Sequence, residues 1–271
     1  MSTLKYKLYP SVLNNFQALL DADVMFEASS NLDAEGEYKR TIEEIEEELT
    51  KNLLDTINRV SHGPIEAADK GTAFNEVIDR IILNANKGND KINIWSSKDY
   101  EVSEGEKASI PCVYAEINGF KFAYDLYLCK DVARDMTGAL PQYRCSAILP
   151  TRYGDVELYG FVDYILKDRV IDLKTTSRYA FPKFEGGWQK LLYPYCLIAS
   201  GDMSDVSEFE YYVVQWRSLA GKPLNGTIYK EAYTYRHDYA KGRLIAMCEH
   251  LIEWLESHRE LITDKKIFAL E

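Results

Sequence analysis

The sequence has no long apolar segment. None of its 271 residues lies in a run of about 18 uncharged apolar residues, the length that a membrane-spanning helix needs. The first residues, MSTLKYKLYPSVLNNF, also lack the apolar stretch of a signal peptide. We therefore expect a protein that stays in the cytoplasm of the cell that makes it and has no membrane partner.

The sequence also lacks closely spaced cysteines. It has five, and none of them forms a CxxC pair. An odd number of scattered cysteines in an intracellular chain is typical of reduced thiols that serve as small core residues. No zinc or iron–sulfur spacing is present.

Positive charge is scarce overall and concentrated locally. The net charge of −11 argues against broad nucleic-acid binding. Residues 167–190 nevertheless hold six basic and three acidic side chains. Residues 41–51, TIEEIEEELTK, are strongly acidic, which favours a solvated helix face. A DNA-mimicking or partner-binding surface is the alternative.

Hydrophobic spacing predicts one domain that mixes helices and strands. Residues 1–109 are expected to be a largely helical N-terminal portion in which 86–109 form a loop. Residues 110–271 are expected to hold the sheet core and a long C-terminal helix, with a hairpin at Asn118-Gly119. The predicted class is α/β or α+β, with a central mixed sheet flanked by helices.

The stretch YGFVDYILKDRVIDLKTTSR, residues 159–178, places charge inside apolar strands. Because side chains alternate across a strand, Asp172 and Lys174 share one face, and a short turn can bring Asp163 beside Asp172. Two adjacent buried carboxylates repel each other, and a divalent cation removes that repulsion. Mg²⁺ prefers oxygen ligands and needs only one or two carboxylates. The alternative is a structural ion pair on a half-exposed sheet.

The D-x-K spacing by itself is weak, because a chain of this length holds about one by chance. Asp264-Lys265-Lys266 is a second example, in a polar tail with no partner carboxylate nearby in sequence. Asp172 differs because an apolar strand precedes it and because Gly160-Phe161-Val162-Asp163 lies on the strand before. Gln189 and Tyr193 follow at i, i+4 spacing and so share one helix face.

Together, GFVD, VIDLKTT and WQKLLYPY resemble the G-x-x-D, D-x-K and Q-x-x-x-Y motifs of the PD-(D/E)XK nuclease superfamily. The RecB-type and lambda-exonuclease-like branch is the most similar. Upstream, LYPSVLNNFQALLD and KGTAFNEVIDRII are similar to the S-x-L and G-x-x-x-H helices of RecB-type domains. The resemblance implies a restriction-endonuclease-like core and a metal-dependent nuclease.

Carried over residue by residue, the resemblance assigns roles to the motif positions. Asp163, Asp172 and the backbone carbonyl of Leu173 would bind Mg²⁺ or Mn²⁺, and Lys174 would position the attacking water. Gln189 and Tyr193 would orient the site or hold the cleaved strand.

The outer parts of the site follow from the same comparison. Glu76 is a further candidate acid for the metal. The residues expected to contact nucleic acid are Arg178, Lys183, Lys190 and Tyr193.

The sequence departs from the branch at two points. Asn75 stands where RecB-type members often carry a metal-binding His, and His62 is a candidate replacement, although a loop histidine is more often simply exposed. Leu19-Leu20 stand where the iron–sulfur members have a cysteine, so no iron–sulfur cluster is expected.

Two functions remain open from the sequence. The first is a DNA exonuclease or end-processing nuclease of recombination, repair or phage genome processing, in a bacterial or phage-infected cell. Its partner would be DNA, with a recombination or replication protein as a second candidate. The alternative is a non-catalytic relative that binds nucleic acid or a protein, which the low pI and Asn75 favour.

Overall fold

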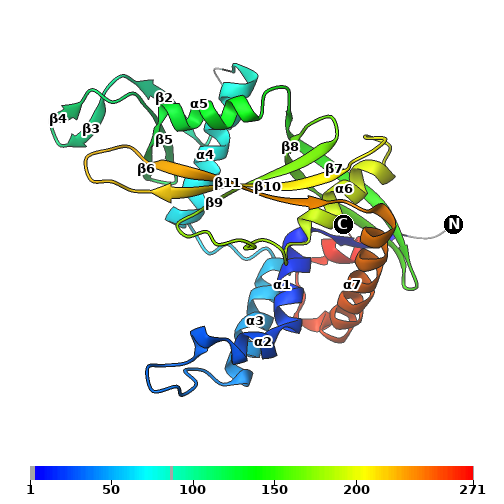
Figure 1. The fold of residues 1–271 in the computed structure, drawn as a ribbon. Coiled ribbons are helices and arrows are strands. Elements are labelled where there is room, and N and C mark those ends of the chain that lie inside the picture. The colour runs from blue at the N-terminus through cyan, green and yellow to red at the C-terminus, as the bar shows by residue number, and fades with distance from the viewer. Residues whose placement is uncertain (1–3, 86–87, 271) are drawn as a thin grey trace.

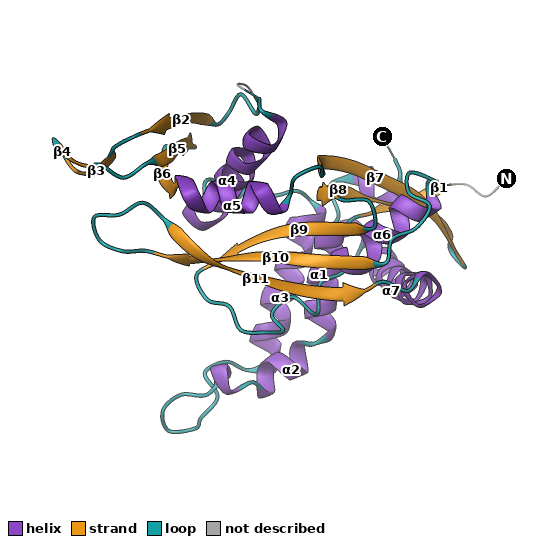
Figure 2. Ribbon diagram, turned by 45° about the horizontal axis from the view of Figure 1, so that its top comes forward, coloured by secondary structure: helices purple, strands orange, loops and turns teal. Residues whose placement is uncertain are grey.

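The structure is a computed structural model that describes residues 4–85 and 88–270. Within these residues it has seven α-helices and eleven β-strands (Figures 1 and 2). The helices are α1 (Pro10–Leu20), α2 (Ala22–Glu27), α3 (Ile42–Ile57), α4 (Glu66–Leu83), α5 (Leu126–Asp135), α6 (Gln189–Ala199) and α7 (His237–Ser257). The strands of the central sheet are β1 (Leu4–Leu8), β7 (Leu140–Thr151), β8 (Gly154–Ile165), β9 (Arg169–Thr176), β10 (Glu208–Arg217) and β11 (Asn225–Thr234).

The central sheet is mixed. Its strand order is β1-β8-β9-β10-β11, with β7 paired to β8 as well. The β1–β8 and β9–β10 pairs are parallel, and the other pairs are antiparallel. The predicted class, α+β with a mixed central sheet flanked by helices, is therefore confirmed.

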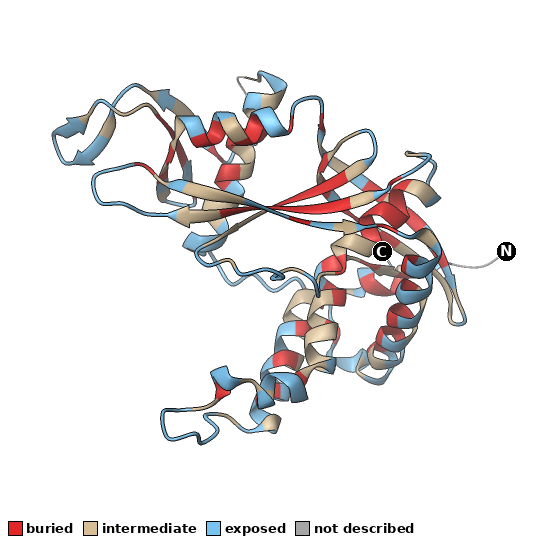
Figure 3. Cartoon of the chain, viewed as in Figure 1, coloured by how far each residue is buried: buried red, intermediate tan, exposed pale blue. Residues whose placement is uncertain are grey.

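Helices cover both faces of this sheet, so the fold has two cores. In Figure 1, α4 and α5 lie on one side of the sheet and α1, α3 and α7 lie on the other. Val170 and Val213 pack into the core with α1, α6 and α7, whereas Ile171 and Leu173 pack into the core with α4 and α5. Buried residues accordingly concentrate in the middle of β9 and β10 (Figure 3). By alternation, Asp172 belongs to the α6 side.

Short-range signals explain several element boundaries. Thr41 caps α3, and its side chain accepts a hydrogen bond from the Glu44 N–H while the Glu44 carboxylate accepts one from the Thr41 N–H. Asn118 and Gly119 have φ values of 50° and 86°, as a tight hairpin turn between two strands requires. The expected hairpin is present as β5 (Cys112–Ile117) and β6 (Phe120–Asp125).

The expectation of a loop over 86–109 was wrong for about half of that range. Residues 86–87 lie outside the described part, but β2 (Asn93–Ser97), β3 (Tyr100–Ser103) and β4 (Glu106–Ala108) follow. β2 pairs with β5, and β3 pairs with β4. These strands are mostly exposed and polar, so they carry little hydrophobic periodicity. In addition, β1 of the largely helical N-terminal portion belongs to the central sheet.

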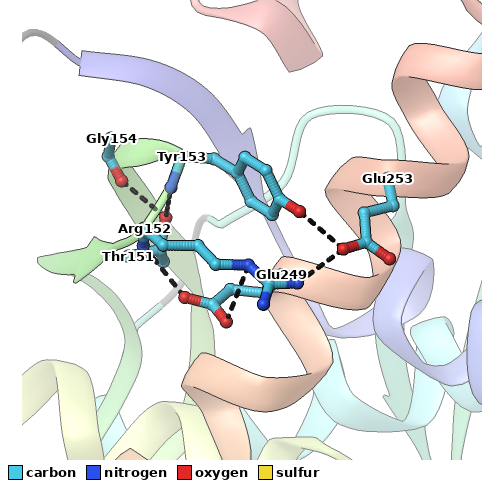
Figure 4. A network of polar contacts seen from close by, with 6 residues as sticks. All are labelled: Thr151, Arg152, Tyr153, Gly154, Glu249 and Glu253. Atoms are coloured by element: carbon cyan, nitrogen blue, oxygen red, sulfur yellow. Dashed lines mark hydrogen bonds and ion pairs between the residues drawn. The ribbon is translucent and has the colours of Figure 1, made fainter.

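The outer end of the long β7–β8 hairpin is tied to α7 by a polar cluster (Figure 4). The Arg152 N–H donates to Glu249 Oε1 at 2.9 Å, and the Arg152 guanidinium and the Tyr153 hydroxyl both donate to Glu253 Oε1 at 2.5 Å. This cluster fixes the hairpin at the end away from Asp163.

Two expectations from composition can be compared with the described residues. All five cysteines are buried and free, as expected of core thiols. In the described part of the chain, no helix combines the length and the apolar character needed to cross a membrane.

Candidate active site

Asp163 lies at a point where the strand ladders are interrupted. β8 pairs with β9 at Tyr164↔Ile171 and Ile165↔Val170, and continuing this register places Asp163 opposite Asp172. In the β7–β8 register the position opposite Asp163 is Gln142, which has a φ of 51° and is missing from the ladder. Instead of a ladder bond, the Leu173 N–H donates to Asp163 Oδ2 at 2.8 Å. The carboxylate is thereby fixed against β9.

Asp172 and Lys174 form an ion pair on the same strand face. Lys174 Nζ lies 2.7 Å from Asp172 Oδ2, in a geometry too bent for a normal hydrogen bond. Asp172 is only 4% exposed, whereas the Lys174 side chain is 28% exposed. The lysine therefore connects a buried carboxylate to solvent. The structure brings together the three charged side chains that the sequence singled out.

Helix α6 adds the next layer of contacts. Gln189 Nε2 donates to Asp172 Oδ1 at 3.3 Å, and the Tyr211 hydroxyl donates to Gln189 Oε1 at 3.4 Å. Tyr193, one turn later, packs against β8 so closely that a Cβ on Gly160 would lie 2.5 Å from its Cε1 atom. Gly160 is therefore needed for the approach of α6 to β8. Gln189 and Tyr193 both lie beside the carboxylates.

Burial and mutual repulsion dominate the electrostatics of the site. Burial raises the pKa of Asp163 far above its usual range, and the neighbouring Asp172 raises it further. The Leu173 N–H and the Lys174 ammonium act in the opposite direction and are weaker. Burial, followed by the charge of Asp172, also raises the pKa of Tyr193, so its hydroxyl stays protonated at neutral pH. The carboxylate pair therefore requires either a proton or a cation.

Helix α4 approaches the site from the other side of the sheet. A Cβ on Gly71 would lie 2.9 Å from Thr175 Oγ1, so the start of the helix touches β9. Asn75 Oδ1 is buried and accepts no hydrogen bond from the described residues. Glu76, the weaker metal candidate, binds Arg80 at 2.8 Å and the Asn89 N–H at 2.8 Å. Both contacts are made by the Oε1 atom of Glu76.

Asp79, four residues after Asn75, is a buried acid that the sequence reasoning missed. The Tyr164 hydroxyl donates to its Oδ1 at 2.7 Å. Burial raises the pKa of Asp79 to about 6, although the hydrogen bond from Tyr164 opposes this. The i, i+4 spacing from Asn75 within an apolar helix face was the available signal. Asp79 also contributes to the raised pKa of Asp163.

The donor set fits a hard divalent cation. The described residues contain no cluster of three or more His, Cys, Asp or Glu side chains suited to a metal. They do provide the two carboxylates, and Mg²⁺ commonly uses one or two and keeps several waters. The buried oxygens Asp172 Oδ2 and Asn75 Oδ1 lack normal hydrogen bonds. The role of the Leu173 carbonyl as a ligand stays a prediction. His62 lies 3.6 Å from Asp55 and is mostly exposed.

The three basic residues expected to contact nucleic acid differ in how many contacts they make within the protein. Lys183 Nζ donates to Thr176 Oγ1 at 2.6 Å and to the Arg178 carbonyl at 2.7 Å, so it braces its own loop. Lys190 Nζ contacts the Glu185 carbonyl, and burial lowers its pKa. Arg178 is exposed and has no ion pair within the described residues. Of the three, Arg178 is the freest to meet an anion.

The loop between β9 and α6 is held by Glu231, a second buried acid that the sequence reasoning missed. Its carboxylate accepts hydrogen bonds from the N–H groups of Lys183 (3.1 Å) and Phe184 (2.9 Å). It also accepts from the hydroxyls of Tyr179 (2.9 Å) and Tyr233 (2.6 Å). Burial alone would raise the pKa of Glu231, but these four donors together lower it. The loop that leads to Gln189 is thereby fixed on β11.

No family model matches the sequence, and no curated protein matches it. Among solved structures, the chain is similar to the crystal structure of SSO0001, with a TM-score of 0.42 and 8% identity over 94% of this chain and 79% of that chain. A likeness this weak carries no argument about family or activity.

Proposed function

We propose that the protein is a metal-dependent DNA nuclease that uses Mg²⁺ or Mn²⁺. The supporting observation is that Asp163, Asp172 and Lys174 converge on one face of the sheet, with Lys174 Nζ 2.7 Å from a buried carboxylate. Buried acids with perturbed pKa values mark candidate functional sites. Their motif context resembles PD-(D/E)XK nucleases of the RecB type, which favours exonuclease or end-processing activity in recombination, repair or phage genome processing.

In this proposal Asp163 and Asp172 hold the cation. When bound, the cation would act as a Lewis acid that stabilises charge on the phosphate under attack. The Lys174 side chain is 28% exposed, so its ammonium can donate a hydrogen bond to the attacking water or to a phosphate oxygen. Gln189 orients Asp172 by donating a hydrogen bond to its Oδ1 atom, and the Tyr211 hydroxyl orients Gln189 in the same way.

The supporting groups act as donors. The protonated Tyr193 hydroxyl can donate to a phosphate or to a carboxylate, because its raised pKa keeps the proton in place. Arg178 is available for the nucleic-acid backbone. The proposed place of action is the cytoplasm of a bacterial or phage-infected cell.

The test uses linear duplex, circular and single-stranded DNA with Mg²⁺, Mn²⁺ or EDTA. We expect metal-dependent digestion that Asp172→Ala and Lys174→Ala abolish. Asp131→Asn, which removes an exposed carboxylate on α5, is the matched control and should digest normally. Digestion that survives in EDTA or in both site variants would contradict the proposal.

A non-catalytic binding module is the second candidate. The close Asp172–Lys174 pair, the substitution of Asn75 for a metal-binding His and the net charge of −11 favour it. DNA or protein binding that is unaffected by Asp172→Ala and Lys174→Ala, with no digestion in any metal, would support this function over the first.

A further inference from the structure

The loop between β9 and α6 carries the most exposed large apolar side chain of the described residues. Phe181 in this loop is 70% exposed, which is unusual for its residue type. The loop, residues 177–188, follows the strand that holds Asp172 and Lys174 and ends directly before Gln189, where α6 begins. Both of its ends therefore lie at the candidate active site.

Hydrogen bonds hold the loop on both sides of Phe181. The Tyr179 hydroxyl and the Lys183 N–H both donate to Glu231 Oε2, at 2.9 and 3.1 Å. The Phe184 N–H donates to the other oxygen of Glu231 at 2.9 Å. The chain thus fixes the backbone on either side of an aromatic ring that is itself left in solvent.

The residue that holds the loop lies on the same sheet face as the carboxylate of Asp172. Asp172 is opposite Tyr211 in the β9–β10 register, and Tyr211 is opposite Glu231 in the β10–β11 register. Paired residues of neighbouring strands share a face, and Tyr211 packs into the core with α6 and α7. Because neighbouring strands are about 4.8 Å apart, Glu231 lies roughly 10 Å from Asp172, on the α6 side.

A second aromatic ring lies in the row of Lys174. This lysine is opposite Val213, which is opposite Tyr229 on β11, so Tyr229 shares its face at a similar distance of roughly 10 Å. Tyr229 is 37% exposed, and its ring centroid lies 4.8 Å from that of Tyr179 on the loop. The neighbouring Arg178 is exposed and, in the part of the chain that the structure describes, has no ion pair. Aromatic rings and an available guanidinium therefore lie beside Lys174.

We infer that Phe181 and Tyr229 stack against unpaired bases of the DNA strand that enters the candidate site, so that the preferred substrate is single-stranded DNA or an unpaired DNA end. The reaction in this inference rests on the proposed nuclease function, whereas the binding does not. In a duplex the faces of internal bases are covered by their neighbours, so an aromatic ring reaches them only in an unpaired strand. Arg178 would contact the backbone phosphates of the same strand.

The experiment measures DNA binding without cleavage. Fluorescently labelled single-stranded DNA and a blunt duplex of the same sequence are titrated in EDTA with the parent, Phe181→Ala and Phe181→Trp. We expect Phe181→Ala to bind single-stranded DNA about tenfold more weakly, as the loss of one stacking contact predicts, and to bind the duplex like the parent. Phe181→Trp should bind like the parent, because it keeps an aromatic ring.

Phe161→Ala is the matched control. Phe161 is also strongly exposed, at 57%. It alternates with Val162, which is buried in the core with α6, so its ring lies on the opposite face of the sheet. This variant should bind both DNAs like the parent. Unchanged melting temperatures establish that the variants are folded.

The outcomes separate this inference from the proposed function. If the parent digests DNA but Phe181→Ala binds single-stranded DNA as tightly as the control, the stacking assignment is wrong and the nuclease proposal stands. If no metal supports digestion but Phe181→Ala alone loses single-stranded DNA binding, the nuclease proposal fails and the stacking assignment stands. An equal loss on duplex DNA would overturn the assignment to unpaired bases. A dimer in light scattering that Phe181→Ala dissociates would identify a contact between copies of the chain and overturn it as well.

Discussion

Replacing Asp163 with Asn should stabilise the metal-free protein while it abolishes cleavage. Opposite residues on paired strands have Cβ atoms about 5 Å apart, and at an effective dielectric constant of 20 two charges at that distance repel by about 3 kcal/mol. The Lys174 ammonium and the Leu173 N–H offset part of this repulsion. Asn keeps an oxygen that can accept from Leu173. We therefore expect a gain of roughly 1–3 kcal/mol at pH 8, or several degrees in melting temperature.

The gain should depend on pH in a defined direction. The pKa of Asp163 is raised in the folded protein, whereas an unfolded Asp has a pKa of about 3.9. Between these two values the folded state holds a proton that the unfolded chain has lost, so the stability of the parent falls as pH rises. Asn cannot ionise, so the advantage of Asp163→Asn should be large at pH 8 and small at pH 5.

Thermal melting in EDTA at both pH values is the assay. Mg²⁺ should raise the melting temperature of the parent and leave that of Asp163→Asn unchanged, because only the parent retains both ligands. Asp131→Asn is the exposed control and should show no pH-dependent gain. A variant that is less stable than the parent at pH 8, or one whose gain is equal at pH 5 and pH 8, would refute the repulsion argument.

Three further predictions follow from other contacts. Glu231→Gln should lower the free energy of unfolding by roughly 1–3 kcal/mol at pH 7, because hydrogen bonds to a charged acceptor contribute that much. The pKa of Glu231 is lowered in the folded protein. The difference in melting temperature from the parent should therefore become smaller as pH falls below about 4 through the folded pKa. Gly160→Ala should cost about 1–3 kcal/mol and reduce kcat, because the added Cβ would meet the buried Tyr193 ring; normal melting and normal turnover would contradict this packing. The Mg²⁺ concentration for half-maximal cleavage should fall by up to about tenfold per pH unit as pH rises towards the raised pKa of Asp163, because metal binding displaces the proton of this carboxyl group. If metal titrations give the same half-maximal concentration at every pH, Asp163 is not a ligand.

The sequence predicted the centre of the candidate site because its signals are local. Asp172 and Lys174 share a face through the two-residue period of a strand, and the short turn after β8 sets Asp163 opposite. Gln189 was placed by the helical period in the same way. These contacts span 30 residues or fewer, so strand and helix spacing together with the flanking motifs could predict them.

The parts that the sequence missed depend on distant contacts. β1 is five residues long and pairs with residues 155–158, about 150 positions later. Glu231 is fully buried only because the loop around Lys183 folds onto β11. Polar hairpins such as β3–β4 have no buried face, and therefore no periodic pattern to recognise.

Asp163 at the candidate site and Glu231 in a structural contact are both shielded from solvent, but the chain supplies them with different numbers of hydrogen-bond donors. Glu231 receives four hydrogen bonds from the chain itself, so its negative charge is satisfied and its pKa is lowered. Asp163 receives only one N–H and faces another carboxylate, so burial and then the charge of Asp172 raise its pKa. Glu231 is fully buried and Asp163 is half-buried, and burial disfavours the charged form of both carboxylates. The two carboxylates differ in the number of hydrogen-bond donors that the chain supplies. Because Asp163 has few donors and a second acid beside it, a cation from solution would stabilise its charged form.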